Sequence, residues 1–186
     1  MENDPKYVVQ PLGTQNRAAF CSGDAELDRY FLERASRDVR EKISAVFVLL
    51  KQEDSRTVLG YYTLSSQEID AGDLPIKLIK KTGKYKRIPA TLLGRLAIAK
   101  TLRGRRLGEF LLMDALRRSL EATNEVMSFA VVVDAKTDDV ATFYKKYGFL
   151  LLTHRRFFLP MKTIENTLSI RTRKLSIPYL LVFLGW

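Results

Sequence analysis

A short basic loop carrying two glycines lies between a strand-like and a helix-like segment, at residues 103–108. The first N–H groups of a helix lack intrahelical partners, and the helix dipole makes this end positive. Glycines let the backbone approach a bulky anion and arginines add charge, so the loop is a candidate phosphate-binding site. Alone the pattern is weak, because basic residues beside glycines are common. The residues concerned are Arg103, Gly104, Arg105, Arg106, Leu107 and Gly108.

The basic residues of the chain are concentrated in the same region. The formal net charge is +10, yet the segment from Leu74 to Arg106 holds eleven lysines and arginines and no acid, which leaves about −1 for the remainder. Such a block indicates a polyanionic partner met on one face, with a solvated, mobile basic loop as the alternative. Before the loop itself, the block consists of Lys77, Lys80, Lys81, Lys84, Lys86, Arg87, Arg95 and Lys100.

The elements of the first half of the chain must help to position these residues. The sequence patterns there predict one helix and three strands. Apolar residues of one segment recur at helical spacing after a capping residue, Ser22 or Asp24. Two strand-like runs are separated by a polar turn. We predict a strand at Tyr7–Pro11, a helix from Ala25 to about Lys42, strands at Ser44–Lys51 and Val58–Ile69, and a long connection over Asp70–Pro89 with a helical turn near Pro75–Lys80.

The second half alternates strands and helices more regularly. Gly148 is placed to end a helix in the manner of a C-cap, and Asp138 to cap the start of the same helix. We predict strands at Thr91–Ala99, Ser128–Ala135 and Arg155–Pro160, and helices at Leu107–Ala122 and Asp138–Tyr147. This order predicts an α/β (α+β) domain with a mixed, mostly antiparallel sheet around a β-α-β core.

The loop and a later segment, Ala141–Phe149 (ATFYKKYGF), together resemble the GNAT superfamily of N-acetyltransferases. The cofactor loop of that family reads Arg/Gln-x-x-Gly-x-Gly/Ala, and a later helix carries an FY…GF signature. Here the first and last loop positions match, but Arg106 replaces the inner glycine. Either the loop opens and this arginine assists, or the affinity for acetyl-CoA falls, with Gly104 placed to compensate in part. The resemblance implies the GNAT fold, with helices on both faces of the sheet, and acetyl-CoA as co-substrate.

Further motifs resemble one branch of that superfamily, the GNAT-fold toxins of bacterial type II toxin–antitoxin modules. They extend from about Val8 to Ile164 and are short individually but specific in their order and spacing. The resemblance implies acetylation of the free α-amino group of aminoacyl-tRNA, which blocks translation, by a homodimer that a ribbon-helix-helix antitoxin neutralises. The motifs are Gly60–Leu64 (GYYTL), Pro89–Ala97 (PATLLGRLA), Leu111–Leu116 (LLMDAL), Val133–Ala135 (VDA), Phe143–Tyr144 (FY) and Phe158–Lys162 (FLPMK).

Acetyl transfer from a thioester to an amine needs a neutral amine, a polarised carbonyl and a proton for the leaving thiolate. An α-amino group has a pKa of about 7.7–8.0, so an appreciable fraction is neutral at cytosolic pH and no strong base is required. The only histidine, His154, lies in no motif. In the family, the strand before the loop splays from its neighbour and frees main-chain groups for the pantetheine arm. The resemblance therefore assigns Leu96, Ala97 and Ile98 to the cofactor, and Phe143 is either a core residue or a wall beside the pantetheine arm.

Tyr144 is the predicted general acid, a role carried over from the matching tyrosine of the toxins. A phenol has a pKa of about 10 and is protonated at neutral pH, so it can protonate the thiolate of coenzyme A. The alternatives are that Tyr144 only packs, or that Tyr147, three residues on, takes the role. The predicted tRNA contacts are basic side chains that would meet phosphates: Lys77, Lys80, Lys81, Lys84, Lys86, Arg87 and Arg95.

Two other functions stay open: a GNAT enzyme that acetylates a small amine or a protein N-terminus, and a non-catalytic basic nucleic-acid-binding module.

One cysteine, Cys21, excludes an intramolecular disulfide framework and a Cys-rich zinc site, and no metal is predicted. The N-terminus lacks the layout of a signal peptide, and the apolar end Ile177–Trp186 is about half of the roughly 20 residues that span a bilayer. We therefore expect a cytoplasmic protein without membrane contact.

The resemblance also divides the chain into two parts. Residues 1–164 form the predicted acetyltransferase domain, and residues 165–186 form an atypical apolar C-terminal tail. The tail has no clear amphipathic period. Three alternatives are open for the tail: that it docks on the sheet, that it extends a dimer contact, or that it has no role.

Overall fold

A seven-stranded sheet forms the centre of the protein, in the order β1-β2-β3-β4-β5-β7-β6. The computed structural model describes residues 7–174, without the side chains of residues 81, 82 and 170–174. Neighbouring strands are antiparallel, except that β4 and β5 are parallel and are connected by helix α4. The strands are β1 (Tyr7–Pro11), β2 (Ala45–Lys51), β3 (Gly60–Asp70), β4 (Arg87–Ile98), β5 (Ala130–Asp134), β6 (Leu150–Thr153) and β7 (Arg156–Pro160).

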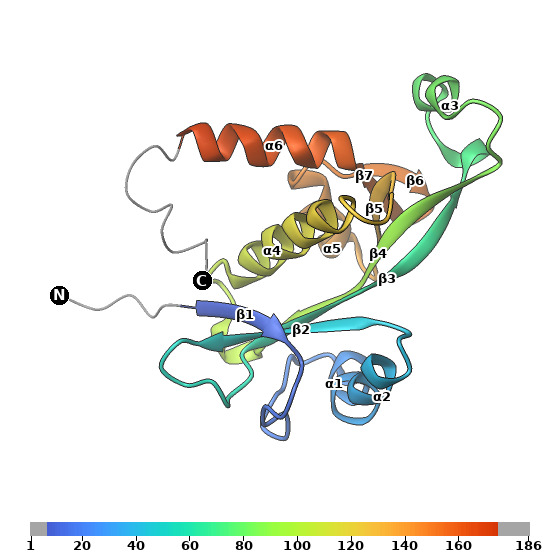
Figure 1. Ribbon diagram of the computed structural model, residues 1–186. Coiled ribbons are helices and arrows are strands. Elements are labelled where there is room, and N and C mark those ends of the chain that lie inside the picture. The colour runs from blue at the N-terminus through green and yellow to red at the C-terminus, as the bar shows by residue number, and fades with distance from the viewer. Residues whose placement is uncertain (1–6, 175–186) are drawn as a thin grey trace.

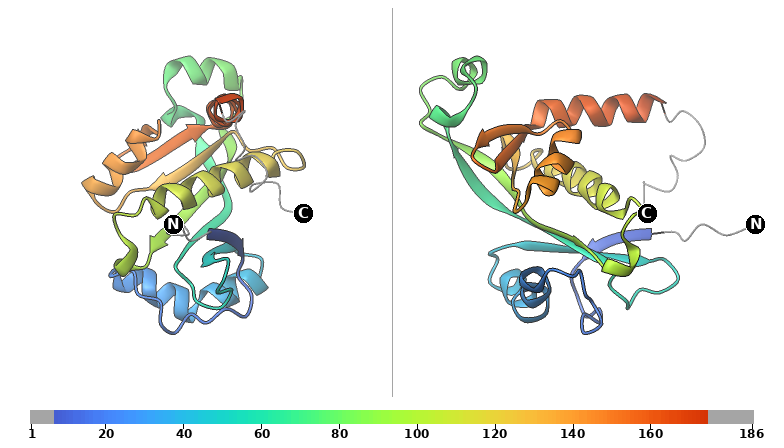
Figure 2. Two further views of the ribbon diagram at one scale, coloured as in Figure 1. Left: turned by 90° about the vertical axis from the view of Figure 1, so that its left-hand side faces the viewer. Right: turned by 180° about the vertical axis from the view of Figure 1, so that it is seen from behind.

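Helices cover both faces of this sheet (Figures 1 and 2). On one face α1 and α2 enclose an aromatic core in which the rings of Phe31 and Tyr61 stack 4.3 Å apart. On the other face α4, α5 and α6 share a second core. This arrangement confirms the predicted fold class. The helices are α1 (Ala25–Glu33), α2 (Ala35–Arg40), α3 (Ile76–Thr82), α4 (Leu107–Ala122), α5 (Asp138–Lys146) and α6 (Met161–Lys174), with 3-10 turns at Ala71–Asp73 and Lys100–Leu102.

Helix α4 is fixed to the sheet by polar contacts as well as by its buried apolar face. Asp114 accepts a hydrogen bond from the hydroxyl of Tyr62 on β3 at 2.6 Å and another from Nε of Arg118 at 2.9 Å. A second nitrogen of Arg118 donates to the carbonyl of Val9 on β1 at 3.1 Å. These contacts join the middle of α4 to β3 and β1.

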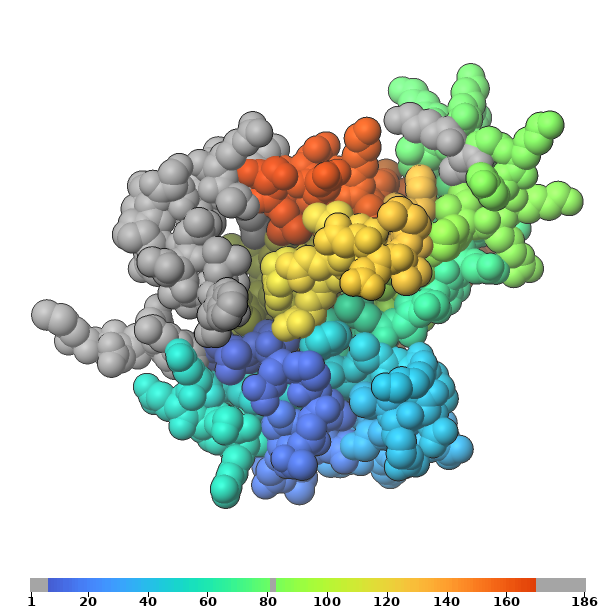
Figure 3. All heavy atoms as spheres, viewed as in Figure 1, coloured from blue at the N-terminus to red at the C-terminus, as the bar shows by residue number. Residues whose placement is uncertain are grey.

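Strands β3 and β4 extend beyond the body as a two-stranded arm that carries α3 at its end (Figure 1). Arg87 pairs with Asp70, so β4 begins four residues before the predicted Thr91. The connection is correspondingly shorter than the predicted Asp70–Pro89, and its helical turn is α3. The most basic part of the chain therefore lies at the tip of an arm, which projects from the body of the molecule in the space-filling view (Figure 3).

The helix predicted from Ala25 to Lys42 is two helices, so that prediction is wrong in its continuity. The chain bends at Arg34, where φ is −115° and ψ is −32°. No glycine or proline marks the bend. It turns α2 back so that Asp38 accepts a hydrogen bond from the Tyr30 hydroxyl at 2.9 Å. Tertiary contacts rather than local signals fix this break.

In the C-terminal half the predicted helices α4 and α5 are confirmed, whereas helix α6 (Met161–Lys174) was not predicted. Gly148 ends α5 with φ 85°, as predicted, and its N–H donates to the carbonyl of Lys145 at 3.0 Å. The N-cap is Thr137 rather than Asp138, because the Thr137 side chain accepts from the N–H of Val140. Strand β6, which pairs with β7, was not predicted.

Helix α6 crosses the expected domain boundary at residue 164 and continues to Lys174. The segment after 164 thus begins as helix. The apolar end, residues 175–186, lies outside the described residues.

Candidate active site

Strands β4 and β5 separate soon after they pair. Only Thr91 and Leu92 of β4 pair with β5, although β4 continues to Ile98. From Leu93 onward, no strand of residues 7–174 pairs with β4 on its β5 side. The main-chain N–H and C=O groups of β4 on that side therefore make no hydrogen bonds to a neighbouring strand. This is the geometry that the family resemblance implied for the strand beside the pantetheine arm.

The loop from β4 to α4 closes one end of this splay. It enters α4 through Arg106, whose φ of 59° and ψ of 15° are left-handed. Glycine adopts this conformation without strain and most other residues rarely do, which explains physically why the family pattern has glycine here. Arg106 keeps the same backbone, and its Nε and Nη2 donate to a carboxylate oxygen of Glu109 at 3.0 and 2.9 Å.

The N-terminus of α4 presents backbone donors to open space. Its first intrahelical hydrogen bond runs from the N–H of Phe110 to the carbonyl of Arg106, and no side chain caps the helix. The N–H groups of Leu107 and Gly108 therefore have no helical acceptor. No atom lies within 4 Å of the place where a side chain at Gly104 or Gly108 would begin. A pyrophosphate fits this open, positively polarised end.

A groove of about 360 Å³ joins this loop to α5. It brings together seven of the predicted cofactor residues: Ile98, Arg103, Gly104, Arg106, Leu107, Gly108 and Phe143. Four further residues line the groove: Tyr147, the predicted alternative acid, and three that were not predicted, Leu102, Glu109 and Lys146. Leu96, Ala97 and Arg105 are not among its lining residues. Ala97 is buried in the core beneath α1, on the other face of β4.

Arg103 has a positioning contact of its own. Its Nη2 donates to the main-chain carbonyl of Ser22 at 2.6 Å. The N–H of Lys100 donates to the carbonyl of Cys21 at 2.9 Å. The cofactor loop is thus tied to the segment that precedes α1, and part of the donor capacity of Arg103 is already used.

Tyr144 is buried, with 6% of its surface exposed. Its ring lies 5.3 Å from each of the rings of Phe143 and Phe149. Burial, reinforced by the negative charge of Asp134, raises the pKa of the Tyr144 hydroxyl above its usual value, so the phenol stays protonated. Within the described residues the hydroxyl makes no hydrogen bond, and no side-chain oxygen there is both fully buried and unpartnered. The hydroxyl oxygen therefore reaches accessible space.

Tyr147, the alternative acid, lies closer to the groove. It is half-buried and lines the groove directly, and its ring centroid is 5.0 Å from that of Phe143. Tyr144 lies deeper in the core that α5 shares with α4. His154 is exposed in the turn between β6 and β7, with φ 46°. It is therefore not placed to act as a base in the groove.

The predicted tRNA-binding residues are spread from the arm tip along β4 rather than gathered at one place. At the tip of the arm Lys77, Lys80, Lys84, Lys86 and Arg87 are exposed, while only the backbone of Lys81 is described. Arg95 lies eight residues further along β4, about 26 Å away at roughly 3.3 Å per residue. The cofactor loop lies beyond the opposite end of β4 from the tip (Figure 1).

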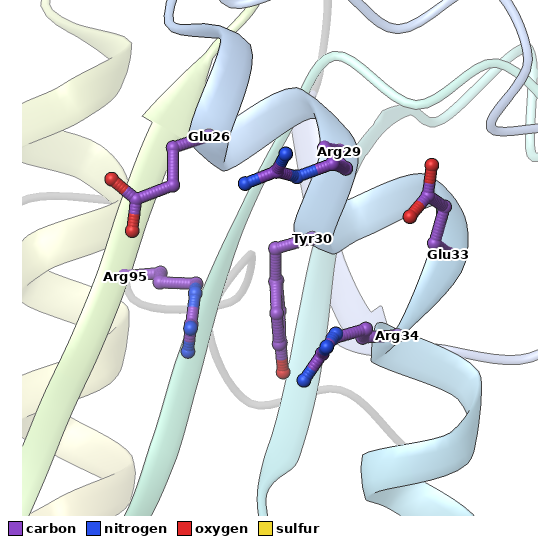
Figure 4. Close-up of a pocket in the computed structure, with 6 residues that line it drawn as sticks. All are labelled: Glu26, Arg29, Tyr30, Glu33, Arg34 and Arg95. Carbon is purple, nitrogen blue, oxygen red and sulfur yellow. The ribbon is translucent and has the colours of Figure 1, made fainter.

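A second pocket, of about 450 Å³, surrounds Arg95 beneath α1 (Figure 4). Among its lining residues only Arg95 was predicted to have a function. The others belong to α1 and its junction with α2, where no motif marks them. The lining residues are Glu26, Arg29, Tyr30, Glu33, Arg34 and Arg95.

Two features are absent from the residues that the structure describes. No group of three or more His, Cys, Asp or Glu side chains among them is arranged to hold a metal ion. None of the helices in that part of the chain is long and apolar enough to cross a membrane.

Sequence comparison relates the chain to bacterial toxins, although no protein-family model matches it. A probable toxin TacT of Sinorhizobium fredii is 28% identical over 175 residues, which cover 88% of this chain and 96% of the relative. A tRNA-acetylating toxin of Mycobacterium tuberculosis is 33% identical over 131 residues, which cover 70% of this chain and 76% of the relative.

Solved structures give the same relation. The toxin AtaT complexed with acetyl-methionyl-tRNAfMet matches with a TM-score of 0.82 and 30% identity, covering 88% of this chain and 99% of AtaT. A Tyr-to-Phe mutant of AtaT, bound to the C-terminus of the antitoxin AtaR and to acetyl-CoA, matches with a TM-score of 0.74 and 27% identity over 88% of this chain and 99% of the mutant. The match extends over nearly all of the described residues.

Proposed function

The chain belongs to the family of the tRNA-acetylating toxins, and on this premise we propose that it acetylates the free α-amino group of an aminoacyl-tRNA and thereby blocks translation. It is an acetyl-CoA-dependent N-acetyltransferase with the GNAT fold. The observation that carries the proposal is the splay of β4 from β5, which ends at the open N-terminus of α4. A thioester on a long phosphorylated arm fits this combination of features.

The cofactor side of the site holds acetyl-CoA through backbone and apolar groups. The free N–H groups of Leu107 and Gly108 receive the pyrophosphate, and Arg106 adds charge at the rim. Ile98 and Phe143 line the path of the pantetheine arm. Main-chain groups of Leu96, Ala97 and Ile98 on the unpaired side of β4 orient the arm, and an N–H among them polarises the thioester carbonyl.

Besides the polarised carbonyl, the transfer needs a neutral amine and one acid. The amine nitrogen attacks the thioester carbonyl carbon, the carbon–sulfur bond breaks, and the amine loses its proton to water. Tyr144 donates the phenolic proton to the sulfur and later recovers a proton from solvent. The raised pKa of this hydroxyl keeps the proton in place at neutral pH. That a Tyr-to-Phe mutant of a similar toxin was crystallised with acetyl-CoA supports the importance of one tyrosine.

The tRNA is held by basic side chains away from the cofactor. Lys77, Lys80, Lys84, Lys86 and Arg87 at the arm tip meet backbone phosphates, together with the predicted Lys81, and Arg95 meets the tRNA nearer the reacting end. The separation of about 26 Å between the tip and Arg95, at roughly 3.3 Å per residue, favours contact at two places along the tRNA.

We also infer partners and organisation that the toxin family implies. An antitoxin is expected because similar toxins bind antitoxins AtaR and KacA in solved complexes; we propose that it has a ribbon-helix-helix fold. We propose further that the toxin is a homodimer and that it is cytoplasmic, where charged tRNA is found. Residues 1–164 remain the proposed catalytic domain, with 165–186 as an added segment.

Incubation with charged tRNA and labelled acetyl-CoA tests the central proposal. We expect label on the aminoacyl group, released as the N-acetyl amino acid when the ester is cleaved with base. The Tyr144→Phe protein should label far more slowly, while Tyr147→Phe should retain most of the activity. Label that never reaches the aminoacyl end, although the protein binds acetyl-CoA, would refute the proposed substrate.

A further inference from the structure

The pocket around Arg95 has the chemistry of an anion site. Three of its six lining residues are arginines, Arg29, Arg34 and Arg95. Two glutamates also line it, but Glu26 is already bound by Nζ of Lys136 at 2.7 Å. Figure 4 shows the arginine side chains around the Tyr30 ring, two of them from the helical segment and one from β4. Positive charge therefore prevails in this pocket.

These three arginines differ from most others in the described part of the chain. None of the three makes a hydrogen bond or ion pair through its side chain with any residue that the structure describes. Elsewhere arginines are engaged by carboxylates or main-chain carbonyls: Arg17, Arg40, Arg87, Arg103, Arg106, Arg117, Arg118, Arg155 and Arg156. Three such groups around one pocket leave many donors for an external anion.

One of the three arginines is held in place by packing instead of by a charge. The guanidinium carbon of Arg95 lies 3.5 Å from the centroid of the Tyr30 ring. Tyr30 is itself fixed, because its hydroxyl donates to Asp38 on α2 at 2.9 Å. Arg95 is thus oriented through the flat face of its guanidinium, and its N–H edge stays available.

The pocket and the cofactor groove lie on opposite faces of β4. Side chains alternate along a strand, so Arg95 shares a face with Ala97, which is buried in the α1 and α2 core. Ile98 points the other way and lines the groove. An anion in the pocket is therefore separated from the pyrophosphate by the strand at which the thioester is presented.

We propose that Arg29, Arg34 and Arg95 bind a phosphate of the single-stranded 3′ end of the tRNA. This inference rests on the proposed function. The aminoacyl group is esterified to the terminal nucleotide, so the phosphates nearest to it must enter beside β4 on the side that acetyl-CoA does not occupy. Bidentate guanidinium–phosphate contacts then fix the strand, and the amine reaches the thioester through the gap between β4 and β5.

The double variant Arg29→Ala/Arg34→Ala tests the site, with Arg56→Ala as the matched control. All three side chains are exposed, so their removal should not disturb folding. Arg56 lies in the turn between β2 and β3 and also has no side-chain partner among the described residues. We measure the KM for charged tRNA, the affinity for uncharged tRNA at several salt concentrations, and the Kd of acetyl-CoA by calorimetry.

We expect the double variant to raise the KM for charged tRNA about tenfold or more and to weaken binding of uncharged tRNA. The slope of log affinity against log salt should fall by about 0.7 for each phosphate that the variant no longer neutralises. The Kd of acetyl-CoA should stay within about twofold of the wild-type value, and Arg56→Ala should behave like wild type.

Three outcomes separate this inference from the function on which it rests. If the wild type labels no charged tRNA, the proposed function fails, but a loss of tRNA binding confined to the double variant would still support the phosphate site. If tRNA binding and KM change no more than in Arg56→Ala, the site is refuted. An increase in the Kd of acetyl-CoA equal to that of the KM for tRNA would assign the arginines to the cofactor and also refute it.

Discussion

The two anion sites beside β4 are built in opposite ways. At the cofactor groove the donors are backbone N–H groups at the start of α4, and the nearby Arg106 is already bound to Glu109. In the Arg95 pocket the donors are side chains from α1, its junction with α2, and β4, without ion-pair partners in the described structure. A backbone site is fixed in shape before its ligand arrives. A side-chain site gains its strength from charge and therefore depends on salt.

The difference suits two ligands of different size. Acetyl-CoA must place one carbonyl carbon within reach of a main-chain donor, so a rigid cradle is an advantage. A tRNA is large and is held at several places, so each contact can be adjustable. Between the two sites lies the seam of β4 and β5, where the reacting groups meet. The predictions below test whether the chemical step, acetyl-CoA binding and tRNA binding depend on different residues.

The largest expected effect is on the rate of the chemical step, through Tyr144. Tyr144→Phe should lower kcat by about 10² or more, the usual contribution of a general acid. The Kd of acetyl-CoA and the KM for charged tRNA should change little, because the hydroxyl belongs to neither anion site. Single-turnover measurement of acetyl transfer provides the test. A greater loss in Tyr147→Phe than in Tyr144→Phe would move the acid to the residue that lines the groove.

The next largest effect should appear at the cofactor cradle. Gly108→Leu places a side chain in the space before the free N–H groups and should raise the Kd of acetyl-CoA about tenfold, or about 1.4 kcal/mol. The free energy of unfolding should not fall, since glycine is roughly 0.8–1.0 kcal/mol less favourable than alanine in a helix, leucine ranks close to alanine, and no neighbouring group lies within 4 Å of the new Cβ. Calorimetry and urea denaturation measure the two. Unchanged acetyl-CoA affinity in this variant would contradict the backbone cradle.

A smaller effect is expected at Arg106, where strain and charge can be separated. Arg106→Gly removes the charge and relieves the left-handed backbone, whereas Arg106→Ala removes the charge only. We expect the glycine variant to be about 1 kcal/mol more stable than the alanine variant. Urea denaturation of the pair measures this difference. Equal stabilities would mean that the backbone at this position relaxes in the alanine variant.

The smallest expected effect concerns the pH dependence of the rate. The rate should not fall again on the alkaline side of the profile. The rate should rise as the acceptor amine loses its proton, with an apparent pKa of about 8 or lower. The protonated phenol is the active form, and burial raises the pKa of Tyr144 above the ordinary value of about 10. No fall in rate should therefore occur below pH 10. A fall near pH 9 under conditions where the protein stays folded would argue against this hydroxyl as the acid.

The elements predicted correctly from the sequence are those whose limits are set by residues close together in the chain. Helix α4 has the predicted limits Leu107–Ala122, and β1 has the predicted limits Tyr7–Pro11. Both follow from apolar periodicity and from a nearby loop signal. Most of the predicted cofactor residues line the groove for the same reason, since the phosphate loop and the helix it opens are contiguous in the chain.

The features that were missed depend on contacts that no local sequence pattern marks. The bend at Arg34 has no helix-breaking residue and is fixed by the contact of Tyr30 with Asp38. Strand β6 is four residues long and is defined by its pairing with β7. The Arg95 pocket needs Arg29 and Arg34 from a region with no recognisable motif. The basic block is continuous in sequence but extends along the length of β4 in space, a separation that its spacing in the chain does not reveal.

The two-residue contact between β4 and β5 also has a consequence for the dynamics of the protein. It divides the sheet into a four-stranded and a three-stranded part, which meet at Thr91 and Leu92 through a short parallel ladder. Local opening takes place where few hydrogen bonds have to break. Few ladder hydrogen bonds therefore hold this junction, and its remaining stability comes from apolar cores that include residues of both parts, such as Leu93 with Val131 and Ala90 with Val132. Amide hydrogens on either side of this joint should exchange earlier than those in the ladder between β3 and β4.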